Sequence, residues 1–314
     1  MAGHLTTLLE MKTTSHMSQQ WKKTVQNQDT IYQLNTKRLL SMKKIIKEVD
    51  EKKGIVQVTI ADERWYLKSE ENKKTGIPEW KSVPSVTWVT QSYPKGIQYF
   101  KWLADKGWDE AEAIKVAAGD KGSKVHKAIE DVLQGIEVRI DSKYINNSTG
   151  QEEELTLEEC DCILSFKSWF DEVKPEVITW ETSVFSDKHN YAGTIDFVCR
   201  IDNQFWIVDF KTSQYIWPSH ELQVSAYKEA ITNGENEVPK YQKGEDIKLA
   251  ILQVGYRKNK AGYKFTEIED QFDLFKAAQL IWKKEHEGEQ PTKKDYPIIL
   301  SPKLEVKEII TDEK

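Results

Sequence analysis

Three strand-forming segments follow one another closely in the second half of this 314-residue chain, and they constrain its fold more than any other feature. They cover residues 177–185, 192–201 and 204–211. The last two are separated only by Asp202 and Asn203. A link this short and polar is typical of a β-hairpin. We therefore expect the second and third segments to be neighbouring antiparallel strands.

Helix and strand signals from residue 110 onward alternate in an order that predicts an α/β fold. The expected helices cover residues 110–134, with a break near Gly119–Gly122, then 155–171, 219–231 with Ser219 as N-cap, and 271–287. Two further strands are expected at residues 247–256 and 263–268, and a polar loop at 141–154. The order predicts a mixed central β-sheet flanked by helices.

The first part of the chain predicts an extension that precedes this core. Apolar residues spaced by three and four indicate helices within residues 1–50, and the alternation at 55–60 and 65–67 indicates a β-hairpin. We expect three parts. They are a mostly helical N-terminal extension at residues 1–108, the α/β core at 109–290, and a C-terminal tail at 291–314.

The third strand of the core ends in Asp209-Phe210-Lys211, a pattern typical of metal-dependent phosphodiesterases. Asp209 and Lys211 share one face of the strand, and Asp196 of the preceding strand is expected opposite Asp209. Adjacent carboxylates repel unless a cation lies between them, and oxygen ligands favour Mg²⁺ or Mn²⁺ over zinc. Such an ion activates water for attack on a phosphate, and a lysine offsets the charge that develops. The strands alone fit equally well with a surface hairpin that holds an ordinary ion pair.

Two further residue pairs stand at helical spacing near these strands. His126 and Glu130 lie four residues apart after Gly122, and so do Gln223 and Tyr227 on the helix that follows Lys211. A single helical histidine is more often structural than a ligand, and a glutamine–tyrosine pair can simply be a buried hydrogen-bonded pair. On the sequence alone these alternatives remain open.

Together these motifs resemble the RecB-family branch of the PD-(D/E)xK nuclease superfamily. That branch carries, in this order, Gly-x-x-x-His, Gly-x-x-Asp, Asp-x-Lys-Thr and Gln-x-x-x-Tyr. This chain has Gly122…His126, Gly193-Thr194-Ile195-Asp196, Asp209-Phe210-Lys211-Thr212 and Gln223…Tyr227. The resemblance covers about residues 110–235. Pro84–Thr87 is similar to the segment before the core in phage-type exonucleases and in the mitochondrial genome maintenance exonuclease.

The resemblance implies a restriction-endonuclease-like core and a role for each matching residue. The implied ligands of one or two Mg²⁺ or Mn²⁺ ions are His126, Asp196, Asp209 and the Phe210 carbonyl. Lys211 would be the catalytic lysine, and Gln223 and Tyr227 would steady it or contact the DNA backbone. Glu181 and Glu130 are second candidates near the site, although exposed glutamates are an equally good explanation of both.

Contacts with DNA must come from local clusters, because the formal net charge of −6 gives no general attraction to nucleic acid. Lys124 belongs to one group of lysines, and Trp88 and Trp102 lie in a segment where aromatic and basic residues mix, which suits stacking on unpaired bases. The alternative is that the lysines lie on a solvated helix face and that the rings belong to the core. For most of the rings we favour the core role. A lid over the site that threads single strands is a further hypothesis.

The predicted function is therefore that of a metal-dependent DNA nuclease, an exonuclease on single-stranded or frayed ends in replication, repair or recombination. A structure-selective endonuclease on the same core is one alternative. A non-catalytic nucleic-acid-binding or scaffold protein is another. The intact set of ligands and the lysine argue against the scaffold.

Composition disfavours several other classes. Three cysteines, Cys160, Cys162 and Cys199, are too few for the four-cysteine iron–sulfur cluster of some relatives and are odd in number for disulfides. Without a Gly-x-x-x-x-Gly-Lys-Ser/Thr loop we expect no ATP site. No apolar run approaches the roughly 18 residues of a membrane span, so no membrane is expected as a partner. The cysteine pattern suits a reducing cytoplasm. The resemblance to phage-type exonucleases implies that of a bacterial or phage-infected cell, and the lack of arginine in residues 1–28 disfavours organellar targeting.

Overall fold

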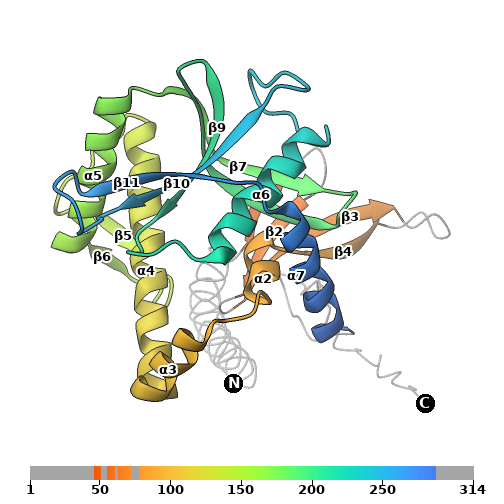
Figure 1. Ribbon diagram of the computed structural model, residues 1–314, viewed down its shortest axis with the longest axis horizontal. Helices are drawn as coiled ribbons and strands as arrows, with labels where there is room; N and C mark the ends of the chain where they lie inside the picture. Colours follow the sequence, from red (N-terminus) through yellow and green to blue (C-terminus); the bar gives the residue numbers. More distant parts are fainter. Residues whose placement is uncertain (1–45, 51–54, 61–62, 72–77, 288–314) are drawn as a thin grey trace, which may run out of the picture.

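The computed structural model describes residues 46–50, 55–60, 63–71 and 78–287, and its centre is a five-stranded mixed β-sheet (Figure 1). The strand order is β11-β10-β9-β8-β7. The strands are β7 (Glu176–Ser186), β8 (Tyr191–Ile201), β9 (Gln204–Lys211), β10 (Ile247–Val254) and β11 (Tyr263–Ile268). Only β9 and β10 pair in parallel, and the other neighbours are antiparallel. The predicted fold class, a mixed sheet flanked by helices, is confirmed.

The predicted hairpin of β8 and β9 is present. Its two linking residues, Asp202 and Asn203, both adopt a positive φ, as a tight two-residue turn requires. The register runs from Ile201 facing Gln204 to Phe197 facing Val208. Beyond that pair the two strands separate, and the site described below lies at their separation.

Helices cover both faces of the sheet (Figure 1). One face packs against α4 (Trp108–Leu133) and α5 (Leu157–Val173). The other packs against α2 (Val86–Gln91), α6 (Pro218–Thr232) and α7 (Phe272–Glu285). Along β9, Val208 and Phe210 belong to the α4–α5 side and Phe205 and Ile207 to the α6 side. By this alternation Asp209 and Lys211 face α6.

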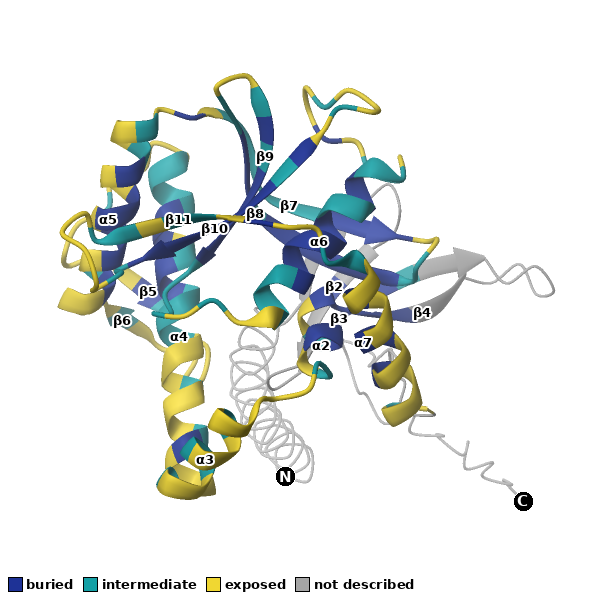
Figure 2. Ribbon diagram, in the orientation of Figure 1, coloured by how far each residue is buried: buried dark blue, intermediate teal, exposed yellow. Residues whose placement is uncertain are grey.

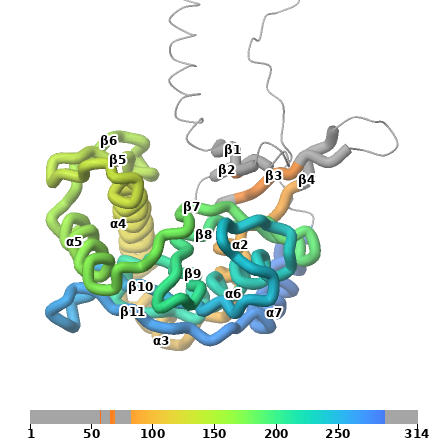
Figure 3. The backbone as a smooth tube through the Cα atoms, turned by 90° about the horizontal axis from the view of Figure 1, so that it is seen from above, coloured from red at the N-terminus to blue at the C-terminus, as the bar shows by residue number. Residues whose placement is uncertain are grey.

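A second, antiparallel sheet precedes the core, in the order β1-β2-β3-β4. Its strands are β1 (Ile46–Asp50), β2 (Ile55–Ile60), β3 (Glu63–Glu71) and β4 (Pro78–Pro84). After β4, Ser85 forms a bridge to Ala192 of β8 and caps α2 by accepting from the Trp88 amide at 3.0 Å. Strand β4 lies beside β8 of the core (Figure 3). Trp65 and Val86 enter the same apolar cluster as α6 and α7. The extension thus packs on the core, while its predicted boundary near residue 108 stays a prediction.

Upstream of α4, the structure differs from the sequence-based expectations in two ways. Residues 46–50 form strand β1 instead of a helix, because pairing with β2 overrides the local helical spacing. The rest of the helix expected within residues 1–50 lies outside the described residues. Strand β4 and helix α3 (Ile97–Lys106) were not predicted, because the sequence shows no clear strand or helix pattern there.

Within the core, three local expectations were wrong. Helix α4 runs unbroken through Gly119 and Gly122, because the helix after them packs Val125 and Ile129 into the core, which offsets the roughly 1 kcal/mol that each glycine costs. The expected loop at 141–154 contains the small hairpin of β5 (Lys143–Ile145) and β6 (Glu152–Glu154). Helix α6 begins at Pro218 with Trp217 as N-cap, not with Ser219.

Helix α3 and the first half of α4 project from the rest of the molecule and are largely exposed (Figures 1 and 2). Among the described residues α3 buries none of its own side chains. Within the same described part of the chain, no helix combines the length and apolar character needed to cross a membrane.

Candidate active site

Three potential metal ligands from three elements converge where β8 and β9 separate. They are His126 of α4, Glu181 of β7 and Asp196 of β8, and one ligand atom of each lies within 4.8 Å of the others. His126 Nδ1 is 3.4 Å from Asp196 Oδ1. Two carboxylates and an imidazole form an oxygen-rich donor set that fits Mg²⁺ or Mn²⁺.

Glu181 reaches this cluster through an unusual backbone conformation. Its neighbours Trp180 and Thr182 face Phe197 and Ile195, so Glu181 lies opposite Asp196. Its φ is 45°, in the left-handed region that residues other than glycine rarely adopt inside a strand. Strained positions of this kind concentrate at functional sites. From sequence Glu181 was only a second candidate, and the structure brings it together with His126 and Asp196.

The backbone of Phe210 fixes the other two members of the cluster. The Phe210 amide donates to Asp196 Oδ2 at 2.9 Å, and its carbonyl lies 2.9 Å from His126 Nε2. Because a carbonyl only accepts, Nε2 carries the proton of this hydrogen bond. When the imidazole is neutral, its lone pair is therefore at Nδ1, on the side of Asp196. The Phe210 ring points to the opposite side and packs against Phe166 and Phe197.

A second group of side chains surrounds the end of β9 on the α6 side. Lys211 Nζ lies 2.5 Å from Asp209 Oδ2 and donates to Gln223 Oε1 at 3.4 Å. Gln223 Nε2 donates to Asp209 Oδ1 and to the Tyr227 hydroxyl, both at 2.9 Å. Asp209 is only 1% exposed. The amide of Gln223 therefore joins the carboxylate, the lysine and the tyrosine in one buried network.

Tyr227 holds its place in this network through Gly193. A Cβ at residue 193 would lie 2.5 Å from Tyr227 Cε1, closer than real atoms approach. The glycine of Gly-x-x-Asp and the tyrosine of Gln-x-x-x-Tyr are thus parts of one packing contact.

The electrostatics distinguish the two aspartates. Burial raises the pKa of Asp209 to about 6; nearby Asp196 adds to this effect and Lys211 opposes it. Burial would also raise the pKa of Asp196, but His126 and Lys211 hold it at about 2. For His126, burial lowers the pKa, and the Asp196 carboxylate more than compensates, so the net shift is upward. The site therefore concentrates negative charge that Lys211 and His126 only partly balance.

Two of the predicted site residues lie apart from the cluster. Glu130 pairs with Lys127 at 2.8 Å and accepts from Gln134 at 2.9 Å along α4. Lys124 is 5% exposed and forms ion pairs with Glu159 at 2.9 Å and Glu153 at 3.4 Å. The predicted contact of Lys124 with DNA has no support in this position, because its ammonium group is already engaged inside the protein.

The aromatic residues predicted to bind DNA divide in a similar way. The Trp88 ring packs edge-on against Trp65, with centroids 4.3 Å apart, and its centroid lies 5.8 Å from that of Trp282. These contacts support a core role for Trp88 and not a contact with DNA. Tyr227 is buried, so its position supports the positioning role and not a contact with the DNA backbone. Trp102 is half-buried on α3, 5.8 Å from Tyr99, and its predicted DNA contact stays a prediction.

His220, on the first turn of α6, is a residue near the site that the sequence analysis missed. Its Nδ1 accepts from the Trp217 amide at 3.3 Å. Burial, with the nearby charges of Lys211 and Lys95, lowers the pKa of His220 to about 3. A neutral imidazole thus lies beside the lysine. Its only signal in the sequence is its place three residues after Trp217, where a helix-capping side chain often stands.

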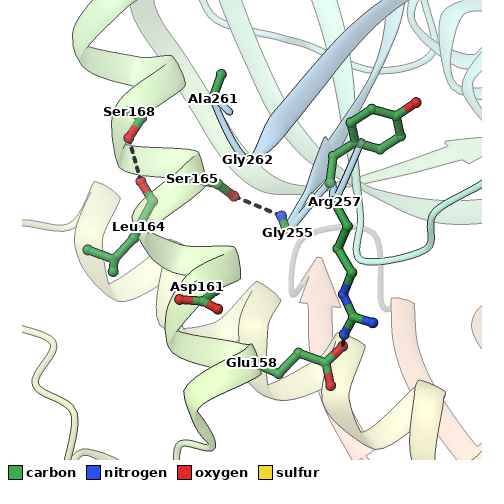
Figure 4. Close-up of a pocket in the computed structure, with 10 residues that line it drawn as sticks. Glu158, Asp161, Leu164, Ser165, Ser168, Gly255, Arg257, Ala261 and Gly262 are labelled. Carbon is green, nitrogen blue, oxygen red and sulfur yellow. Dashed lines mark hydrogen bonds and ion pairs between the residues drawn. The ribbon is translucent and has the colours of Figure 1, made fainter. Parts of the chain in front are cut away.

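A surface cavity of about 390 Å³ lies elsewhere, between α5 and the turn that joins β10 to β11 (Figure 4). Its lining contains Glu158, Asp161 and Arg257 but none of the converging ligands or the Asp209–Lys211 network. We therefore place the chemistry at the end of β8 and β9 and not in this cavity.

Comparison with known proteins agrees with this geometry. A family model described as the PD-(D/E)XK nuclease superfamily matches residues 97–298, which is more than half of the chain. The matched part includes α4, the whole five-stranded sheet and α6, and hence all of the converging residues. No curated protein gives a significant match.

Proposed function

This chain belongs to the PD-(D/E)XK nuclease superfamily, and on that premise we propose that it is an exonuclease that degrades single-stranded or frayed DNA with Mg²⁺ or Mn²⁺. The observation that carries the proposal is the convergence of His126, Glu181 and Asp196 beside the Asp209–Lys211 pair. Such a site has both parts that phosphodiester hydrolysis requires, a place for a divalent ion and a cation for the developing charge.

We assign ion binding to His126, Glu181 and Asp196, with Asp209 at the edge of the same charge cluster. The Phe210 carbonyl, which the resemblance implied as a further ligand, is engaged by His126 in this structure. When bound, a divalent ion polarises the phosphate and lowers the pKa of a water molecule. The protein contributes orientation, because Phe210 fixes both the imidazole and the Asp196 carboxylate through its backbone. A ligand held in one orientation loses little entropy when the ion and the substrate arrive.

Lys211 has the position of the residue that neutralises charge on the phosphate. Its ammonium group is partly exposed, while its partner Asp209 is buried behind it. Gln223 contacts both and prevents the lysine from swinging away. We propose that Lys211 turns part of its hydrogen-bonding capacity from Asp209 to a phosphate oxygen as the reaction proceeds.

Membership of the RecB-family branch is part of the same proposal. The order of the motifs in the sequence supports it, and so do contacts between them. Gly193 contacts Tyr227, and Asp209 contacts Gln223, so four motif residues depend on one another. A role in replication, repair or recombination follows from that membership.

The decisive experiment compares four DNA substrates: linear and circular forms of single-stranded and double-stranded DNA, in Mg²⁺, Mn²⁺ or EDTA. We expect linear single strands to be degraded from an end in either metal, and circular single strands to survive. Cleavage of the circles would establish the endonuclease alternative. Cleavage in EDTA, or none in either metal, would contradict the proposed mechanism.

Metal binding provides a separate test of the ligand set. Changing Glu181→Gln removes one carboxylate charge and should weaken Mn²⁺ binding by roughly tenfold or more, the scale seen when groups around a metal site are altered. Glu130→Gln is the matched control, because Glu130 is paired with Lys127 and is not one of the converging ligands, so this change should leave binding unchanged. Isothermal titration of the two variants checks both; equal losses would remove Glu181 from the site.

A further inference from the structure

Two large aromatic side chains are exposed in the loop that directly follows Lys211 of the candidate active site. Tyr215 and Trp217 are 59% and 53% exposed and lie in the loop of residues 212–217, between Lys211 and α6. Their ring centroids are 6.0 Å apart with an interplanar angle of 46°. Exposed rings of this size are common at binding surfaces, because aromatic groups provide a large contact area at a small entropic cost.

Side chains other than the two rings fix this loop. Gln214 donates through Nε2 to the Gly255 carbonyl at 2.8 Å and accepts through Oε1 from the Arg257 amide at 2.9 Å. Gln253, which is buried, donates to the Ser213 carbonyl at 2.8 Å. Tyr215 and Trp217 enter the loop's hydrogen bonds only through backbone atoms. The backbone that carries the rings is thus held in place, and the rings themselves do not hold the loop together.

Positive charge accompanies the rings. Lys258 Nζ lies 4.5 Å from the centroid of the Tyr215 ring. The neighbouring Arg257 is turned toward Glu158 and forms an ion pair with it (Figure 4). Lys258 is therefore the cation that accompanies the ring. Fixed rings with a cation beside them form the combination that binds single-stranded nucleic acid without sequence preference.

We propose that Tyr215, Trp217 and Lys258, here called the aromatic platform, bind unpaired nucleotides of the substrate next to the cleaved phosphate. The bases stack on the two rings, and Lys258 lies near a backbone phosphate. Base faces are accessible in a single strand and covered by their neighbours in a duplex, so the platform selects unpaired ends. This inference rests on the proposed function and adds to it the part of the protein that distinguishes single from double strands.

Binding measurements test the platform without relying on catalysis. Labelled oligo(dT) and a blunt duplex of equal length are titrated with the full chain in Ca²⁺, and binding is followed by fluorescence anisotropy. Tyr215→Ala and Trp217→Ala should each weaken single-strand binding by about tenfold, as loss of one stacking partner does elsewhere. Duplex binding should change by less than about twofold, and Tyr215→Phe and Trp217→Phe should bind like the wild type, because a stacking ring remains.

The matched control is Trp108→Ala, which removes an even more exposed ring (69%) at the start of α4. It should leave binding of both DNAs unchanged. Unaltered single-strand binding in the two platform variants, an equal loss for duplex, or an equal loss in the control would overturn the proposal. Those results would leave the two rings as the docking site of another protein, or as solvated surface.

Different results would contradict the proposed aromatic platform and the proposed nuclease function. If wild-type protein binds oligo(dT) but cleaves it in neither Mg²⁺ nor Mn²⁺, the proposed function is wrong while the platform still stands. If wild-type protein cleaves single strands and both alanine variants bind as tightly as it does, only the platform is wrong. Thermal unfolding of the variants should match the wild type, because neither ring supports the loop.

Discussion

Lys211→Ala should reduce the rate of single-strand cleavage by about a thousandfold and leave Mn²⁺ binding close to that of the wild type. The magnitude follows from the loss of one group that stabilises transition-state charge in an enclosed site, typically about 10²–10³ in rate. Metal binding should persist, because His126, Glu181 and Asp196 do not depend on the lysine for their positions. Single-turnover cleavage with excess enzyme, together with titration of Mn²⁺, measures the two effects separately.

Lys248→Ala is the matched control for this experiment. Lys248 lies on the neighbouring strand β10, exposed and paired with Glu267, so its removal should change neither rate nor metal binding. If Lys211→Ala retained cleavage within about tenfold of the wild type, the charge-neutralising role of the lysine would be wrong. If it lost Mn²⁺ binding as well, the lysine would be part of the metal site itself.

Gly193→Ala should lower the free energy of unfolding by about 2–3 kcal/mol, the usual cost of an extra group in a packed core, and should lower cleavage as well. The new methyl group would lie 2.5 Å from Tyr227 Cε1 and 3.3 Å from Val86 Cγ2. Tyr227 is buried and bonded to Gln223, so its ring cannot move aside without disturbing the contacts of Asp209 and Lys211. Urea unfolding gives the stability change, and the cleavage assay gives the loss of activity.

Gly119→Ala is the matched control, because the same substitution should raise the free energy of unfolding at this position. Gly119 lies inside α4, and a Cβ there meets nothing within 4 Å. Alanine should therefore stabilise the helix by about 0.5–1 kcal/mol. Comparable destabilisation by both substitutions would show that the effect at residue 193 does not come from contact with Tyr227.

The core of the fold could be predicted because its strands carry their own signal. Strands β8, β9 and β10 are largely buried, and their runs of apolar residues indicate this in the sequence. The two-residue link at Asp202 and Asn203 fixed the β8–β9 register, and with it the proximity of Asp196 to Asp209. Helical spacing likewise indicated that Gln223 and Tyr227 share a helix face, and the two side chains are hydrogen-bonded to each other.

Other features depend on contacts between distant segments and leave no local pattern. Glu181 joins the site because its backbone takes a positive φ opposite Asp196, in a strand that also contains a register shift between Val177 and Thr179. Lys124 is buried because Glu159, on another helix, compensates its charge. From sequence, a buried lysine and a solvated one look the same. Strand β1 forms where its partner β2 is available, although its own residues favour a helix.

The parallel pairing of β9 and β10 has a consequence for how such an enzyme can diversify. Parallel strands end at the same edge, and Lys211 pairs with Gln253, so the loops that follow the two strands emerge side by side although they are some forty residues apart. The turn at 255–262 contributes Lys258 to the aromatic platform and no ligand to the metal cluster. Changes in length or charge within this turn could therefore adjust which DNA ends are accepted and leave the hydrolytic machinery intact. If the aromatic platform binds the substrate as proposed, substrate choice and chemistry are separable traits in this architecture.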